Sequence, residues 1–179
     1  MTKIFAIYPT DKQQSTAFLN KINTYFKRKI DTDWYCYEIK FTDDDHKRCL
    51  NEVANSSAKF ILFMGHGRSD CLFGSCAKES NDFVSSEAMQ YNEIVYKNEN
   101  FINSDNLYLF KDKILFSFSC NSNRKDKNSL GWKAIENEVR CFIGFGDIPT
   151  DYIEKNNFPI KAIAHYKSLI IKIIRRLLN

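Results

Sequence analysis

Glycine and proline are both scarce in this sequence, with six glycines and three prolines among 179 residues. Flexible linkers and low-complexity tracts are usually rich in these residues, so their scarcity argues against several domains joined by linkers. The sequence also contains no internal repeat. We therefore expect a single domain over residues 1–179, which is long enough to bury about two thirds of its unfolded surface.

Long apolar runs are missing as well. The N-terminal run at residues 3–8 ends at Pro9, and it is too short for the core of a secretory signal. No segment approaches the ~18 apolar residues that a membrane span requires. These absences predict a cytoplasmic protein with no transmembrane segment, and they predict that its six cysteines are reduced thiols rather than disulfides.

Metal, cofactor and nucleic-acid sites find little support. Cys71 and Cys76 form a close pair, but no second pair of cysteines or histidines follows at zinc-ligand spacing, so no metal site is predicted. The net charge is only +4, and the basic residues are scattered along the chain, so nucleic-acid binding is not indicated. No glycine-rich phosphate loop follows the first apolar run, and no cofactor is expected.

The apolar pattern alternates between strand-like and helix-like periods. Short apolar runs typical of buried strands occur at residues 3–8, 34–41, 59–65, 113–119 and 140–145. Apolar residues at helical spacing occur in four stretches. These are 13–30, a stretch whose start is marked by residues 43–45, then 128–138, and finally 159–178. Such alternation is typical of crossover units that build a parallel sheet. The prediction is an α/β fold with a mostly parallel sheet flanked by helices.

Three segments carry further expectations. Residues 68–103 are polar without a helical period, which predicts a long binding loop or lid with at most a short extended piece at 93–96. The aspartates at 43–45 are expected to cap the second helix. The last helix, at 159–178, has Lys and Arg along one side; such a helix can lie on an acidic membrane, but we favour packing against the sheet.

Two predicted strands end on reactive side chains. The run at 59–65 leads into His66 and Gly67, and the run at 113–119 leads into Cys120. Because parallel strands share one carboxyl edge, His66 and Cys120 are expected to approach each other, and an imidazole beside a thiol makes a cysteine nucleophile. Taken singly, each has a plainer interpretation, as a core thiol or a loop histidine. Together they predict a cysteine hydrolase, in which Gly67 offers space and a backbone N–H to an oxyanion.

The runs that contain these residues resemble the caspase-like peptidases, the clan of caspases, gingipains, separase and the bacterial CHAT proteases. The resemblance covers residues 3–151 and rests on ILFMGHG at 61–67, KILFSFSCNS at 113–122 and CFIGFGDIPTD at 141–151. The 54 positions from histidine to cysteine agree with the ~50 typical of caspases. Ser-Cys-Asn-Ser at 119–122 is closer to CHAT proteases than to the caspase Gln-Ala-Cys-x-Gly signature.

The resemblance implies a caspase-like three-layer sandwich that acts as a cysteine endopeptidase without metal or cofactor. His66 would be the general base, Cys120 the nucleophile and Gly67 the oxyanion donor. The substrate would be a protein or peptide cut through an acyl-enzyme, with a regulatory protein as a possible second partner. In relatives that cut after Lys or Arg an acidic residue lines the substrate pocket, which assigns Asp147 and Asp151 to substrate binding and leaves Asp70 as a more distant candidate.

Two other functions stay open at this point. The first is a catalytically silent interaction module of the same fold, in which His66 and Cys120 lie apart or the 68–103 loop blocks the cleft. The second is a flavodoxin-like ligand-binding domain, which is less favoured because Tyr8-Pro9-Thr10-Asp11 stands where a phosphate loop would begin.

Overall fold

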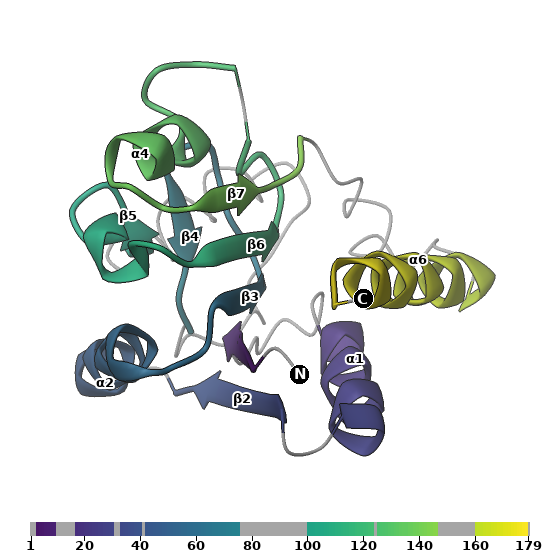
Figure 1. The fold of residues 1–179 in the computed structure, drawn as a ribbon. Helices are drawn as coiled ribbons and strands as arrows, with labels where there is room; N and C mark the ends of the chain where they lie inside the picture. Colours follow the sequence, from purple (N-terminus) through teal and green to yellow (C-terminus); the bar gives the residue numbers. More distant parts are fainter. Residues whose placement is uncertain are drawn as a thin grey trace.

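The structure is a computed structural model, and it describes residues 3–9, 17–30, 33–40, 42–75, 100–123, 125–146 and 160–178. Its centre is a five-stranded parallel sheet in the order β2-β1-β3-β6-β7 (Figure 1). These strands are β1 (Ile4–Pro9), β2 (Trp34–Ile39), β3 (Phe60–Met64), β6 (Ile114–Phe118) and β7 (Cys141–Ile143). They confirm the mostly parallel sheet that the apolar runs predict.

Helices cover both faces of the sheet (Figure 1). One face carries α1 (Ala17–Ile30) and α6 (Ile160–Leu178), whose apolar residues join a core that includes Leu62 and Phe116. The other face carries α2 (Asp43–Asn55), the 3₁₀ helix η2 (Leu107–Phe110) and α4 (Leu130–Glu136), which share a second core with Ile61 and Phe63. The arrangement is therefore a three-layer α/β fold.

The central strands have no face exposed to water. Every residue of β1 and β3 is buried, and successive residues of β3 alternate between the two cores: Ile61 and Phe63 contact one, Leu62 and Met64 the other. A strand covered on both faces needs apolar residues at consecutive positions, which is why these strands appear in the sequence as unbroken runs.

The expectation of a structureless loop at 68–103 is wrong at both of its ends. Short strands β4 (Cys71–Phe73) and β5 (Asn100–Asn103) pair antiparallel and form a separate two-stranded sheet. Leu72, Phe101 and Ile102 are buried in the same core as α2. Strands of three and four residues are too short to show a readable alternation, and the piece expected at 93–96 lies outside the described residues.

One local expectation also needs correction. The residue that caps α2 is Thr42 rather than an aspartate: its side-chain oxygen accepts a hydrogen bond from the Asp45 N–H at 3.3 Å. Asp45 instead accepts hydrogen bonds from the Lys40 N–H at 2.7 Å and the Tyr37 hydroxyl at 2.9 Å. This carboxylate thereby ties the end of β2 to the first turn of α2. The apolar stretch Leu107–Phe110 forms the helix η2, which precedes β6.

Burial and hydrogen bonding act in opposite directions on the Asp45 carboxyl. Burial raises its pKa, but the hydrogen bonds from Lys40 and Tyr37, together with the charge of Arg48, outweigh that effect and leave the pKa below its ordinary value.

Within the residues that the structure describes, no helix combines the length and apolar character needed to cross a membrane.

Candidate active site

His66 and Cys120 follow neighbouring strands at the same level of the sheet. Met64 of β3 and Phe118 of β6 are register partners, and the Gly65 N–H donates to the Phe118 carbonyl at 3.3 Å. His66 and Cys120 each come two residues after these partners. Since adjacent strands lie about 4.8 Å apart, the pairing brings the two loops out of the sheet side by side at its carboxyl edge. Both residues are partly exposed.

Gly67 packs directly against the residue that precedes Cys120. A Cβ atom at position 67 would lie 2.9 Å from the Ser119 Oγ and 3.0 Å from the Ser119 Cβ, with the Leu72 side chain 3.1 Å away on another side. These distances are below ordinary van der Waals contact, so the close approach of the two loops requires glycine here. The Ser119 hydroxyl is itself hydrogen bonded to Ser117 at 2.7 Å.

The chain turns sharply after Cys120. Asn121 has a φ of 55°, in the left-handed region that asparagine tolerates better than most residues. The Asn121 N–H donates to the Gly146 carbonyl at 2.9 Å. Ser122 Oγ donates to the Ser119 carbonyl at 3.2 Å and accepts from the Phe145 N–H at 3.2 Å. The turn is thereby attached to the segment that follows β7.

The loop after His66 is held by β4. The Phe73 N–H donates to the His66 carbonyl at 3.0 Å, and Gly67 and Leu72 form an antiparallel bridge. Within this hairpin the Arg68 Nε lies 2.6 Å from an Asp70 carboxylate oxygen. Because the Asp70 carboxylate already pairs with Arg68, it is a poorer candidate for binding a basic substrate side chain. The preferred candidates, Asp147 and Asp151, lie outside the described residues.

The described cysteines differ in burial, and burial opposes thiolate formation. Burial raises the pKa of Cys36 to about 12 and that of Cys71 to about 12, and it also raises the pKa of Cys49. Cys120 is partly exposed and Cys141 is exposed, whereas Cys49 and Cys71 are buried. A thiol at the carboxyl edge that is neither in the core nor fully exposed fits the environment of a nucleophile better than that of a core cysteine.

The cysteine pair considered for zinc is only half described. The Cys71 thiol donates to the Asn100 side-chain carbonyl at 3.2 Å, and Cys76 lies outside the described residues. Across the described part of the chain, no three side chains of His, Cys, Asp or Glu gather closely enough to hold a metal ion.

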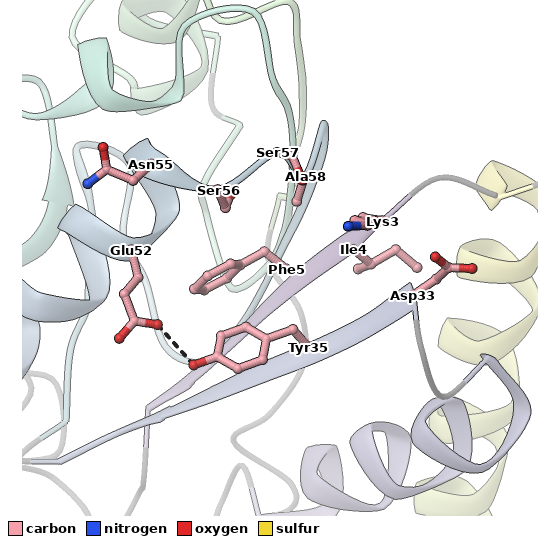
Figure 2. A pocket seen from close by; sticks show the side chains of 10 residues that line it. All are labelled: Lys3, Ile4, Phe5, Asp33, Tyr35, Glu52, Asn55, Ser56, Ser57 and Ala58. Atoms are coloured by element: carbon pink, nitrogen blue, oxygen red, sulfur yellow. Dashed lines mark hydrogen bonds between the residues drawn. The ribbon is translucent and has the colours of Figure 1, made fainter.

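A cavity of about 420 Å³ opens at the opposite, amino edge of the sheet. Figure 2 shows the side chains that line it, with the Tyr35 hydroxyl donating to the Glu52 carboxylate at 2.9 Å. Burial and this hydrogen bond raise the pKa of Tyr35 to about 12. Ligands of open α/β sheets bind outside the carboxyl ends of the strands, and this cavity contains neither His66 nor Cys120, so we do not place the active site there.

Sequence reasoning missed the residues that position the site. Ser119, Asn121 and Ser122 hold the Cys120 turn together, and a short Ser-Cys-Asn-Ser string was their only signal. His46 lies in the first turns of α2, where its Nδ1 lies 2.7 Å from the Thr42 carbonyl and its Nε2 accepts from the Ser75 N–H at 2.9 Å. His46 therefore links α2 to the end of β4 and has a structural role.

Comparison of the chain with protein-family models, curated proteins and solved structures finds no match. The site must therefore be interpreted from its own residues. A histidine and a partly exposed cysteine stand at equivalent positions just after adjacent strands, beside a glycine that packs against Ser119 and Leu72. Such a set can deprotonate the thiol, attack a carbonyl carbon and offer an N–H to the resulting oxyanion.

Proposed function

We propose that this protein is a cysteine endopeptidase in which His66 is the general base and Cys120 the nucleophile. The observation that supports the proposal is the pairing of Met64 with Phe118, because His66 and Cys120 each follow these register partners by two residues. The close contact between Gly67 and Ser119 supports it by joining the two loops on which these residues stand.

The reaction follows from the chemistry of these groups. His66 takes the thiol proton, and the Cys120 sulfur attacks the carbonyl carbon of the scissile peptide bond. The negative charge that develops on the carbonyl oxygen is met by a backbone N–H, for which Gly67 is the candidate. The amine leaves with the proton held by His66, which gives a thioester. Water, deprotonated by His66, then hydrolyses the thioester and regenerates the thiol.

The resemblance to caspase-like peptidases supports the same roles and extends them to specificity. Cleavage after a basic residue would require a carboxylate in the substrate pocket, because an unpaired buried guanidinium or ammonium is costly. We assign that role to Asp147 or Asp151, since Asp70 is paired with Arg68. A cytoplasmic location and a regulatory protein partner belong to the same proposal.

Labelling with an electrophilic peptide ketone tests the nucleophile. Wild-type protein is expected to carry the label on Cys120, and Cys120→Ala is expected to lose it while keeping the same circular dichroism spectrum. Cys141→Ala is the matched control, because Cys141 is an exposed thiol that pairs with Ile114 at the start of β6, whereas Cys120 follows the end of that strand. This variant should label normally. A label that survives Cys120→Ala would contradict the proposal.

The role of His66 separates an enzyme from a silent module of the same fold. If His66 is the base, His66→Ala should slow the labelling of Cys120 at pH 7 by about 100-fold or more. Peptide bond cleavage in a substrate library should be lost in the His66→Ala and Cys120→Ala variants alike. Equal labelling rates with and without His66, together with no cleavage by the wild type, would favour the silent module.

One observation keeps the ligand-binding alternative in view. The strand order β2-β1-β3-β6-β7 is the order of flavodoxin-like domains, which bind ligands where β1 and β3 diverge. At that point Gly65 is close to Pro9, with only 3.2 Å between a Cβ at position 65 and the Pro9 Cδ. Isothermal titration with flavin mononucleotide and with inorganic phosphate tests this function, and saturable binding in the Cys120→Ala variant would support it.

A further inference from the structure

The helical layer that α1 and α6 form has basic residues and no acidic ones. Helices α1 and α6 together contain nine Lys and Arg residues and no Asp or Glu. The whole chain has 26 basic and 22 acidic residues, so the remainder has 17 against 22 and is net negative by 5. The modest overall charge therefore conceals a strong separation of charge between this layer and the rest of the molecule.

The fold brings the two helices that carry these charges into contact. Helices α1 and α6 pack against each other on the same face of the sheet (Figure 1). Among the side chains that the structure describes, seven of the cations are exposed: Lys21, Lys27, Arg28, Lys29, Lys172, Arg175 and Arg176. Within the described part of the chain, none of the seven joins an ion pair. We call these seven residues the basic layer.

The cations of α1 and the cations of α6 are more than 140 positions apart in the sequence, so a reading along the chain does not bring them together. In α1 they occupy residues 21–29, and in α6 residues 172–176. Like charges on adjacent helices repel one another, and this arrangement gives no stabilising pair in return. A partner with many negative charges would relieve that repulsion.

The apolar face of α6 is already occupied. Ile170 is 1% exposed and Ile174 is 0% exposed, both within the core that α1 and the sheet complete. An amphipathic helix that inserts into a bilayer uses that face, so α6 is not available for deep insertion. Leu169, at 53% exposed, is a large apolar side chain that stands among the exposed cations of α6.

We propose that the basic layer binds the anionic headgroups of a phospholipid membrane. Clusters of four to eight Lys and Arg on an amphipathic helix are attracted to acidic lipids, and an exposed leucine suits the boundary between headgroups and acyl chains. Single-stranded nucleic acid is usually bound by aromatic side chains placed between cations, and no described aromatic side chain of α1 or α6 is exposed. This surface function is independent of the peptidase chemistry.

Vesicle flotation tests the proposal with the intact Cys120→Ala protein, which removes any autolysis. The protein should float with vesicles of phosphatidylcholine containing phosphatidylserine and stay behind with phosphatidylcholine alone. Because the contact is electrostatic and peripheral, about 0.5 M NaCl should release it. Failure to float with the phosphatidylserine vesicles at low salt would overturn the proposal, even if the protein bound duplex DNA or RNA.

Two matched triple variants separate the basic layer from net charge. Lys172→Glu, Arg175→Glu and Arg176→Glu together should weaken partition onto the acidic vesicles by about 100-fold or more. Lys47→Glu, Lys125→Glu and Lys127→Glu change three other exposed lysines by the same total charge and should retain most of the binding. Equal loss in both variants would show a net-charge effect and overturn the assignment to the basic layer. Circular dichroism and thermal unfolding establish that each variant is folded.

Discussion

Gly67 and Ser119 approach so closely that a methyl group at position 67 would lie 2.9 Å from the Ser119 hydroxyl oxygen. The two residues belong to different loops, one after β3 and one after β6, and each is the neighbour of a proposed catalytic residue. The spacing between these loops is therefore set by the absence of a side chain at Gly67. Any change that forces the loops apart should affect the catalytic pair before it affects the core.

Gly67→Ala should reduce peptidase activity more than stability. We expect the added methyl to displace Ser119, with a loss of about 100-fold in kcat/KM and about 1 to 3 kcal/mol in the free energy of unfolding. Steady-state kinetics and urea unfolding measure the two effects. Gly146→Ala is the control, since nothing lies within 4 Å of a Cβ at that position. Addition of Ser119→Gly should restore part of the stability, and no restoration would contradict the steric explanation.

Asn121 should tolerate glycine and reject a β-branched residue. Its φ of 55° costs a β-branched side chain about 1 to 3 kcal/mol, whereas glycine adopts it freely. Asn121→Val is therefore expected to lower the urea midpoint clearly and to slow the labelling of Cys120. Asn121→Gly should stay close to wild type in both measurements. Equal behaviour of the two variants would show that the turn is not held in this conformation.

Asp45 should make stability depend on acid pH. The pKa of its carboxyl lies below the ordinary value in the folded state, so the stabilisation is fully present above the unfolded pKa of about 3.9 and is lost as the pH falls through the folded pKa. Asp45→Asn should cost about 1 to 3 kcal/mol near pH 7. The difference from wild type should shrink as the pH is lowered from about 5 to 2. A constant difference across that range, measured by urea unfolding, would contradict this account.

Thiol reactivity should divide the cysteines into two groups. The raised pKa values of Cys36 and Cys71, both about 12, and the raised pKa of Cys49 predict slow reaction at pH 7 in the native state. Cys120 and Cys141 should react with iodoacetamide first. Mass spectrometry of partly modified protein gives the order, and in urea the buried thiols should react at the rate of the others. Rapid native modification of Cys49 would show that the core is less closed than described.

The sequence predicts much of this fold because its strands and helices have strong apolar patterns. Strands β1 and β3 appear as unbroken apolar runs, since each is covered on both faces, and the strand-helix alternation indicates the parallel sheet. The sequence predicts an aspartate as the cap of α2, which is wrong, because Thr42 and Asp43 are both good capping residues. The pattern does not reveal that the Asp45 carboxylate accepts hydrogen bonds from Lys40 and Tyr37.

The sequence by itself determined that His66 and Cys120 each end an apolar run, and that parallel strands would bring such ends to one edge. Only the tertiary structure decided that the two strands are neighbours in register, that Gly67 packs on Ser119, that β4 and β5 pair, and that the cations of α1 and α6 lie on adjacent helices. The reason is physical. Periodicity is a property of successive residues, whereas pairing, steric contact and the summed field of distant charges depend on packing between segments that are far apart in the chain.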